Sequence, residues 1–453
     1  MTTKRRPLPT ANRETGLDVL KGLIQDRSLL TALVLTRKGV GNAFKITLPR
    51  FSPAVFAGPD TNRQILVNER EKFKWRSEKD PVTKLLRHGI LVTDGEEHDK
   101  LRAVLNPALQ RKYVIPYITK FWQCTDQIIS TWQDGKVYDM LIESRRIALL
   151  ILFDALFHVD FTPQIDRLWD PILDILKYIS PGAWIFWPDM PRPKYRKAIH
   201  ELDNYFYKII KSRREKVKST SELGEGEDLL TKLVQTPGMS DNLIRDQLMT
   251  LFIAGHDTST AMLAWALYLI GNHAHVIAKA SIEANQVLGN TNQPPSIDQI
   301  NNLTYLDKVI KETLRLYPPI HVGNRIAIED MGIQGYDVQQ GTRVMCSIYL
   351  THHDEEIWSN PDQFDPERFD RLSGEKVPPL SYIPFGGGPR NCIGAAFSQI
   401  EGKIVLARIL QTFQLQIVQD SKVHPYMGAT LEPRPGVMMR VWRRRIKNAN
   451  QVA

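Results

Sequence analysis

The stretch Phe385-Gly-Gly-Gly-Pro-Arg-Asn-Cys-Ile-Gly394 decides how the rest of the chain is interpreted. Its three consecutive glycines let the backbone turn tightly and come close to a flat partner. Cys392 follows, and an apolar helical pattern begins directly after it, from Ala395 to Phe413. A sulfur at the start of a helix faces free backbone N–H groups and the positive end of the helix dipole, which favour a thiolate. We therefore expect this loop to present one thiolate to a metal.

Five positions of this stretch match the signature F-x-x-G-x-R-x-C-x-G, namely Phe385, Gly388, Arg390, Cys392 and Gly394. The sequence therefore resembles the cytochrome P450 family. An isolated cysteine is more often simply a buried side chain, but five matched positions within ten residues argue against that reading. The resemblance implies that Cys392 is the ligand of the iron of heme b (iron protoporphyrin IX). It also implies that Phe385, Arg390 and Gly394 contact this cofactor.

Length and composition suit one large unit. The 453 residues are 42% hydrophobic and 24% charged, so the chain can bury a large core. No linker, low-complexity tract or internal repeat divides it, and we expect residues 1–453 to form a single heme-thiolate monooxygenase domain. Its three cysteines, Cys124, Cys346 and Cys392, cannot all pair, which suits a reducing compartment. No N-terminal segment approaches the ~20 apolar residues of a membrane span, so we expect a soluble, cytoplasmic monomer without a transmembrane anchor.

The chain carries 59 basic and 50 acidic side chains, a net charge of +9. Such an excess is either a solvated basic surface or a docking surface for an acidic partner. Basic clusters include Arg111-Lys112 and Arg213-Arg214. The resemblance implies an electron donor of the ferredoxin or flavodoxin type, and these proteins are small and acidic. No aromatic and basic platform for nucleic acid is visible, so we expect no nucleic-acid partner.

Hydrophobic periodicity predicts a mainly α protein with small, discontinuous β-sheets, and the resemblance implies the triangular cytochrome P450 fold. Apolar residues recur at helical spacing in most of the chain between residues 61 and 315. The β-rich pieces lie near residues 40–60, 320–350 and 412–443, and the first of them reads as a hairpin. The predicted helices are Arg102–Leu109, Tyr117–Trp132, Met140–Phe157, Ile199–Val217 and Asn242–Asn272.

The longest helical pattern, Asn242–Asn272, carries a polar step, Ala254-Gly-His-Asp-Thr-Ser-Thr260, at its centre. Polar groups in a buried helix are costly unless they serve a purpose. We expect small residues at 254 and 255 to leave room for a ligand, and Thr258 to bond back to the preceding turn. A polar break between two core helices is the alternative. The segment resembles the A/G-G-x-D/E-T motif of the family, which implies that Ala254 lies against the heme and that Asp257 and Thr258 are the catalytic acid–alcohol pair.

Glu312 and Arg315 are three residues apart on one helical face, just before the stop Leu316-Tyr-Pro-Pro319. Such a pair alone is usually a weak surface ion pair. Here Pro366-Glu-Arg-Phe369 follows downstream, and the order matches the E-x-x-R and P-E-R-F segments of the family. The resemblance implies a structural network of Glu312, Arg315 and Arg368 that holds the cysteine loop.

The two heme propionates need cationic partners. His98 and Arg102, four residues apart, match the W/H-x-x-x-R motif of the family. Arg325 follows the proline turn, and Arg390 lies in the cysteine loop itself. The resemblance therefore implies four candidate partners. The other histidines, His256, His321 and His352-His353, read as structural side chains.

The substrate pocket is expected to be apolar. Ile320 and Val322 should line it, together with residues of Arg76–Val92, Trp184–Trp187 and Met427–Thr430. A hydrophobic substrate such as a terpene or a fatty acid fits such a lining. The resemblance implies a monooxygenase that inserts one atom of O2 into this substrate, with electrons from NAD(P)H through the redox partner.

Two other classes stay open. A heme-thiolate peroxygenase or isomerase needs no redox partner, but such enzymes typically lack the acid–alcohol pair. A heme sensor or electron-transfer protein needs a second strong axial ligand, and the polar step of the central helix offers only alanine and glycine where it would point.

Overall fold

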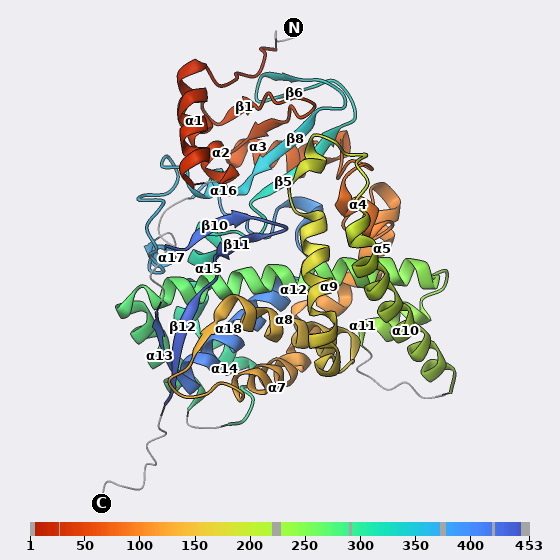
Figure 1. The fold of residues 1–453 in the computed structure, drawn as a ribbon, viewed down its shortest axis with the longest axis vertical. Helices are drawn as coiled ribbons and strands as arrows, with labels where there is room; N and C mark the ends of the chain where they lie inside the picture. Colours follow the sequence, from red (N-terminus) through yellow and green to blue (C-terminus); the bar gives the residue numbers. More distant parts are fainter. Residues whose placement is uncertain are drawn as a thin grey trace, which may run out of the picture.

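The computed structural model describes residues 5–26, 28–219, 228–289, 292–371, 377–418 and 422–444. Helices make up most of this part of the chain (Figure 1). In chain order they are α1 (Arg13–Asp26), α2 (Leu29–Val40), α3 (Pro59–Arg63), α4 (Pro81–Leu86), α5 (Gly95–Leu109), α6 (Arg111–Val114), α7 (Ile118–Ile129), α8 (Met140–Phe157), α9 (Ile165–Ile179), α10 (Arg196–Ser219), α11 (Leu229–Gln235), α12 (Asp241–Gly271), α13 (Ala274–Leu288), α14 (Ile297–Asn302), α15 (Thr304–Leu316), α16 (Ile348–His352), α17 (Arg368–Arg371) and α18 (Ala395–Thr412).

The strands are short and come from distant parts of the sequence. They are β1 (Ala43–Lys45), β2 (Ala54–Phe56), β3 (Phe73–Lys74), β4 (Val137–Asp139), β5 (Val322–Ala327), β6 (Met331–Ile333), β7 (Tyr336–Val338), β8 (Arg343–Ser347), β9 (Phe413–Ile417), β10 (His424–Met427), β11 (Leu431–Arg434) and β12 (Met438–Arg443). The largest sheet has the order β1-β2-β8-β5-β3, and β10-β11, β4-β12-β9 and β6-β7 form separate small sheets. The expected fold class, mainly helical with discontinuous sheets, is therefore confirmed.

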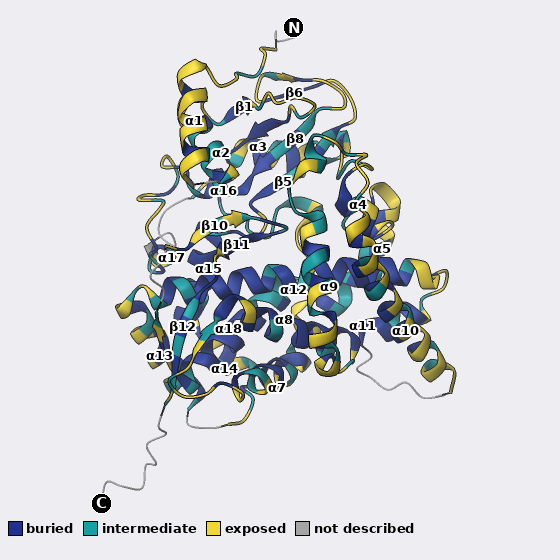
Figure 2. Cartoon of the chain, in the orientation of Figure 1, coloured by how far each residue is buried: buried dark blue, intermediate teal, exposed yellow. Residues whose placement is uncertain are grey.

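Helix α12 runs across the middle of the molecule in Figure 1. The β-rich part with α1 and α2 lies on one side of it, and the helical body with α7, α8 and α18 lies on the other. Most of α12 is buried along its length (Figure 2). Its start is defined by Ser240, whose side chain accepts a hydrogen bond from the backbone N–H of Leu243. This central helix thus lies between the β-rich part and the helical body.

Helix α8 is apolar on almost every side because it is enclosed by other helices. Aromatic rings fill the space between α8, α10 and α12. Phe153 stacks on Phe161 at a centroid distance of 4.0 Å and meets Tyr205 at 5.8 Å and Phe252 at 6.0 Å. Large buried rings such as these dominate the energy of a core, so they fix the position of α12 against α8.

Several predicted elements are confirmed. Helix α8 has the predicted bounds, and the hairpin near residue 50 is the antiparallel pair β1 and β2. Helix α12 is continuous through its polar step, so the alternative of a break between two helices is wrong. Strands β3 and β4 were not predicted, because both fall in the stretch with mainly helical periodicity.

A buried ionic network connects α15 to the segment before the cysteine loop. Arg315 Nε and Nη2 donate to the two carboxylate oxygens of Glu312 at 2.8 and 2.9 Å, and Arg368 Nε donates to Glu312 Oε1 at 3.2 Å. Arg315 Nη1 also donates to the carbonyl oxygen of His352 at 2.8 Å. Burial lowers the pKa of His352 to about 3, and its Nε2 accepts the backbone N–H of Ile383 at 2.9 Å. The network therefore reaches the chain two residues before Phe385.

Within the described residues, no single helix is long and apolar enough to cross a membrane. Helices α12 and α13 pass that test only as a pair that is bent by 114° between them.

We predict that Glu312→Ala lowers the free energy of unfolding by about 3–5 kcal/mol, because it leaves two buried guanidinium groups without their carboxylate. Urea unfolding followed by far-UV circular dichroism measures this change. The control is Glu96→Ala, which removes the exposed partner of Lys100, a pair with side chains 91% and 79% exposed. That variant should have the same free energy of unfolding as the parent. Equal losses of unfolding free energy in Glu312→Ala and Glu96→Ala would contradict a special role for the buried network.

Candidate functional site

The shape of the cysteine loop depends on its glycines. Gly386 and Gly388 have positive φ angles of 74° and 67°, a conformation that costs other residues energy. A Cβ atom on Gly388 would also lie 2.2 Å from the carbonyl oxygen of Leu66. The backbone N–H of Cys392 donates to the carbonyl oxygen of Phe385 at 2.8 Å and closes the loop. The main chain therefore turns back just before α18 and places Cys392 at its N-terminal side.

Cys392 is an accessible free thiol in an enclosed place. The residue is exposed, while Ile383 before it and Phe397 after it are buried. Burial raises the pKa of the Cys392 thiol, while the backbone N–H of Gly394 and the charge of Arg102 lower it. Burial has the larger effect on the free thiol, although the N–H of Gly394 acts in the direction expected for a sulfur at a helix start. A bound metal cation would supply the missing charge, because a coordinating thiol loses its proton.

Helix α12 has an opening at Ala254. This residue is exposed, although Phe252, Ile253, His256 and Asp257 around it on the helix are at most 7% exposed. Gly255 does not leave room for a ligand as expected, because a Cβ there would lie 2.7 Å from Leu152 Cδ1 on α8. Gly255 instead allows α8 and α12 to pack closely.

The opening at Ala254 and the cysteine loop belong to neighbouring elements. Ser259 Oγ on α12 donates to Glu401 Oε2 on α18 at 2.6 Å, which joins the helix of the opening to the helix that follows Cys392. Ile320, after the proline turn, is 40% exposed, whereas Val322 at the start of β5 is buried. Ala254 and Ile320 are thus exposed beside mostly buried neighbours, and Cys392 is exposed together with Asn391 in the cysteine loop.

The acid–alcohol pair has a defined geometry. Thr258 Oγ1 donates to the carbonyl oxygen of Ala254 at 2.6 Å, which is the expected bond to the preceding turn. Asp257 Oδ1 accepts from Arg145 Nη2 at 2.9 Å, and Oδ2 accepts from Thr430 Oγ1 at 2.8 Å. Arg145 also donates to Glu432 Oε1 at 2.5 Å. Both oxygens of the Asp257 carboxylate therefore accept hydrogen bonds, one from α8 and one from the β10–β11 hairpin.

The sequence patterns did not predict the roles of Arg145, Thr430 and Glu432 beside Asp257, although Thr430 was expected in the pocket lining. Arg145 had a signal, since it is a cation inside the apolar pattern of α8 and is only 3% exposed. Such a charge is rarely buried without a partner. The partners themselves lie far along the chain, and no local pattern connects them to α8.

The four candidate propionate partners gather around one ring and one loop. The Arg325 guanidinium lies 3.6 Å from the centre of the Trp75 ring, and that of Arg390 lies 5.0 Å from it. Arg102 Nη2 donates to Asn391 Oδ1 in the cysteine loop at 2.7 Å. Burial lowers the pKa of His98, and the nearby charges of Arg390 and Arg102 add to this effect. Trp75, which was not predicted, is the residue that brings Arg325 and Arg390 together.

These cations exceed the carboxylates that face them. Arg390 pairs with Asp94 at 2.8 Å, but no ion pair is found for Arg102 or Arg325 in the part of the chain that the structure describes. Arg325 is 7% exposed, and burial lowers its pKa to about 9. A buried cation without a carboxylate is costly, so this place favours an anionic ligand such as a pair of propionates.

The donor set fits heme better than a simple metal ion. Among the described residues, no group of three or more His, Cys, Asp or Glu side chains could hold a metal. A single thiol can still bind iron when a macrocycle supplies the remaining ligands, as in heme-thiolate proteins. One accessible cysteine beside several unpaired cations meets both requirements of that cofactor.

A separate cavity of about 1090 Å³ lies between α8, α9, residues 180–195 and the β10–β11 hairpin. Trp184, Gly428 and Ala429 line it, as expected for the substrate pocket. Ile320, Val322 and residues 76–92 do not line this cavity, and Trp187 is 54% exposed. The cavity therefore takes in only part of the segments expected to line the substrate pocket.

Comparison with known proteins gives consistent matches. A cytokinin hydroxylase of Arabidopsis thaliana is 33% identical over 377 residues, which cover 78% of this chain and 71% of that relative. The chloroplastic carotene epsilon-monooxygenase of Arabidopsis thaliana is 26% identical over 392 residues, 80% of this chain and 72% of that relative. The crystal structure of the cytochrome P450DA heme domain shares the fold, with a TM-score of 0.85, 24% identity and coverage of 97% and 98%.

A family model described as Cytochrome P450 matches residues 19–440, a range that includes the cysteine loop, α12 and the buried network of α15. Because that match takes in nearly the whole chain and the fold agrees with it, this chain belongs to the cytochrome P450 family and is a heme-dependent monooxygenase.

Proposed function

We propose that this enzyme binds heme b through Cys392 and inserts one atom of O2 into an apolar substrate, a terpene or a fatty acid. Its electrons come from NAD(P)H through a ferredoxin or flavodoxin. The observation that carries this proposal is the accessible Cys392 thiol on an element that neighbours the opening at Ala254, with Asp257 and Thr258 directly after that opening. The remaining roles follow from the contacts of the chain itself.

On the cysteine side, Cys392 supplies the sulfur ligand, and the N–H of Gly394 bonds to that sulfur. Such a bond moderates the electron density that the sulfur donates. When bound, the heme supplies the activation of O2, and the thiolate favours O–O cleavage over reversible oxygen binding. His98, Arg102, Arg325 and Arg390 would hold the propionates, and Phe385 would contact the cofactor. The Glu312 network keeps the loop in place.

On the opposite side, Asp257 and Thr258 handle protons. The Thr258 hydroxyl donates its hydrogen bond to the carbonyl oxygen of Ala254. The hydroxyl must therefore rotate before it can donate toward the opening. Asp257 is held by Arg145 and Thr430, and Arg145 also lines the 1090 Å³ cavity. Water in that cavity can therefore resupply protons to the Asp257 carboxylate when the bond to Arg145 opens.

Two observations support an apolar substrate. Ala254 and Ile320 offer exposed hydrocarbon surface, and the 1090 Å³ cavity is lined mainly by apolar and aromatic side chains. One relative is named for carotene, a long hydrocarbon. Water exclusion by such surfaces also protects the oxygen chemistry from side reactions.

For the electron donor, Arg111 and Lys112 are the best-placed basic pair. Both are exposed on α6, which packs against α18, the helix that follows Cys392. The other cluster is not a free basic surface, because Arg213 is bound to Asp228 and Arg214 donates to Asp241 at 2.5 Å. A small acidic protein docked at α6 would lie on the cysteine side.

The other two classes receive less support. His256 is buried, and burial lowers its pKa to about 3, but it occupies a different face of α12 from the exposed Ala254. It is therefore a poor second axial ligand for a sensor or an electron-transfer protein. The intact pair Asp257 and Thr258 argues against a peroxygenase or isomerase.

Turnover under ¹⁸O2 tests the proposed function. With NADPH, a ferredoxin and its reductase, a terpene or fatty-acid substrate should gain one ¹⁸O atom, and the rate should fall as salt screens the docking charges. Mass spectrometry measures the label. Efficient product formation with hydrogen peroxide alone, and none with the ferredoxin system, would instead establish the peroxygenase class.

Replacement of the proposed ligand should be decisive. We expect Cys392→Ala to lose the red-shifted absorption band of the reduced CO complex that thiolate ligation produces. Cys346→Ala, which removes a buried thiol elsewhere, should keep this band. A normal band in Cys392→Ala would exclude Cys392 as the ligand.

The role of Thr258 has a matched control on the same helix. Thr258→Ala should bind substrate normally but form product about 10²-fold more slowly, with most NADPH electrons recovered as hydrogen peroxide. Thr260 makes the same type of bond, to the carbonyl oxygen of His256 at 2.8 Å, but is fully buried. Thr260→Ala should therefore keep normal coupling, and equal uncoupling in both variants would point to general damage of α12.

A further inference from the structure

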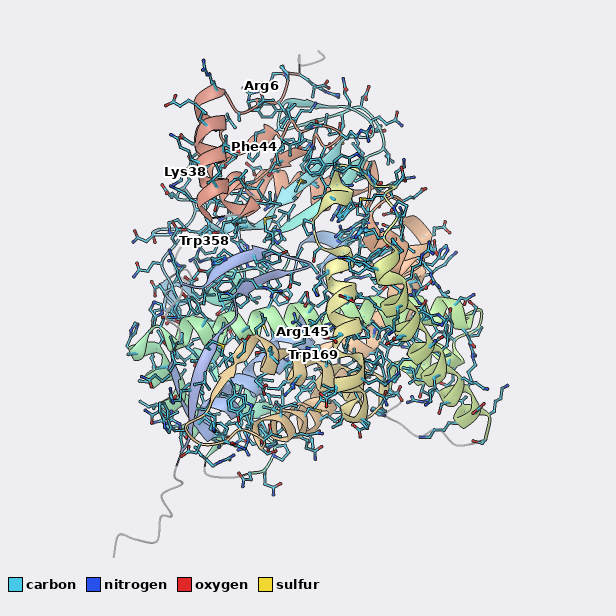
Figure 3. All side chains as sticks on the ribbon, in the orientation of Figure 1. Arg6, Lys38, Phe44, Arg145, Trp169 and Trp358 are labelled. Carbon is cyan, nitrogen blue, oxygen red and sulfur yellow. The ribbon has the colours of Figure 1, made fainter. Side chains whose placement is uncertain are left out.

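The cavity of about 1090 Å³, called the side cavity here, is mostly apolar but not electrically neutral. Its apolar surface includes Ile142, Trp169, Leu173, Leu176, Trp184 and Met190. Arg145 and Trp169, which both line it, are labelled one above the other near the middle of Figure 3. Its volume lies just above the range for small-molecule sites, roughly 300–1,000 Å³.

The charges around the side cavity are unbalanced. The cationic side chains that line it are Arg145, Lys177, Arg192, Lys194 and Arg434, and the anionic ones are Asp139 and Glu432. Both carboxylates are already engaged. Asp139 Oδ1 accepts the backbone N–H groups of Leu141 and Val437, and Glu432 accepts from Arg145 and Arg434. The lining therefore carries a surplus of positive charge.

Two of the cations have no carboxylate partner in the described part of the chain. Lys177 pairs with Asp174 at 3.5 Å, but no ion pair is found for Arg192 or Lys194. Arg192 Nη1 donates to the carbonyl oxygen of Tyr178, while the enclosed Nη2 has no hydrogen-bond partner. These two residues therefore form the unpaired cationic end of the cavity.

This end is also preorganised. The Arg192 guanidinium lies 4.4 Å from the centre of the Tyr178 ring and 6.0 Å from that of Tyr195, and the Lys194 ammonium lies 4.7 Å from the Tyr195 ring. Cation–π contacts of this kind hold both charges in place. Hydrogen bonds between a cationic group and a carboxylate are about twice as strong as neutral ones, so two fixed cations at this end of the cavity favour an anionic group.

We propose that the side cavity is the entrance and head-group site for the substrate, and that this substrate is an apolar molecule with a terminal carboxylate. Arg192 and Lys194 bind the carboxylate, and the hydrocarbon body lies against Trp169 and Trp184. The inference rests on the proposed monooxygenase function. It narrows the substrate class from terpenes or fatty acids to terpenes that carry a carboxylate and fatty acids. Three cations of the expected lining segment Arg76–Val92, namely Arg76, Lys84 and Arg87, are not alternative anchors. Arg87 pairs with Asp203 at 3.1 Å, Lys84 donates to Pro188, and none of the three lines the cavity.

The test compares dodecanoic acid with dodecan-1-ol, which has the same chain but no charge. Binding to the heme-loaded enzyme is measured by calorimetry and by quenching of tryptophan fluorescence, so that no turnover is needed. We expect the acid to bind at least about 10-fold more tightly than the alcohol, as charge-assisted hydrogen bonds would provide. The double variant Arg192→Gln/Lys194→Gln should lose that preference and keep the affinity for the alcohol.

Lys197→Gln is the control, because Lys197 is 89% exposed, pairs with Glu201 and does not line the cavity. It should bind both ligands like the parent. Equal affinity of the parent for acid and alcohol would overturn the inference, as would a double variant that keeps the preference for the acid. Oxygenation of an uncharged terpene by the same preparation would then show that the proposed function stands although the carboxylate site does not.

Discussion

The carboxylate of Glu312 is the point on which the arrangement of the reactive cysteine depends. It is fully buried, and it accepts from both Arg315 and Arg368, so one anion neutralises part of two cations. The remaining N–H groups of the two guanidinium side chains donate to carbonyl oxygens, including those of His352 and Ser359. Because His352 in turn accepts from Ile383, an interaction on α15 sets the direction in which the chain enters the cysteine loop. Removing the carboxylate would therefore affect both the core and the site.

The sequence predicts the parts of the site that lie within one local motif. The cysteine loop, the Asp257-Thr258 step and α8 follow from residue types and spacing that are local. The small strands β3 and β4 do not, because each is two or three residues long and is defined by a partner far away in the chain. The same reason explains why the roles of Arg145, Thr430 and Trp75 were missed and why Arg213 was taken for a surface charge. Burial and pairing across the fold decide these roles, and periodicity carries no information about them.

The cysteine loop and the polar step of α12 differ in how charge is balanced. Around the cysteine loop, Arg102 and Arg325 have no ion-pair partners among the described residues. Beside α12 the reverse holds, since Asp257 is held between Arg145 and Thr430. Under the proposed function, an anionic cofactor would complete the first arrangement, and the second would act only when the bond between Asp257 and Arg145 opens.

The close approach of Gly388 to the carbonyl oxygen of Leu66 joins two segments that lie far apart in the sequence. Contacts between such distant segments form slowly, because a long loop must close before they contribute. The cysteine loop can therefore take its shape only after the segment of Leu66 has reached it. A substitution that shifts the backbone at Leu66, far from every motif of the site, would change the surroundings of the thiol.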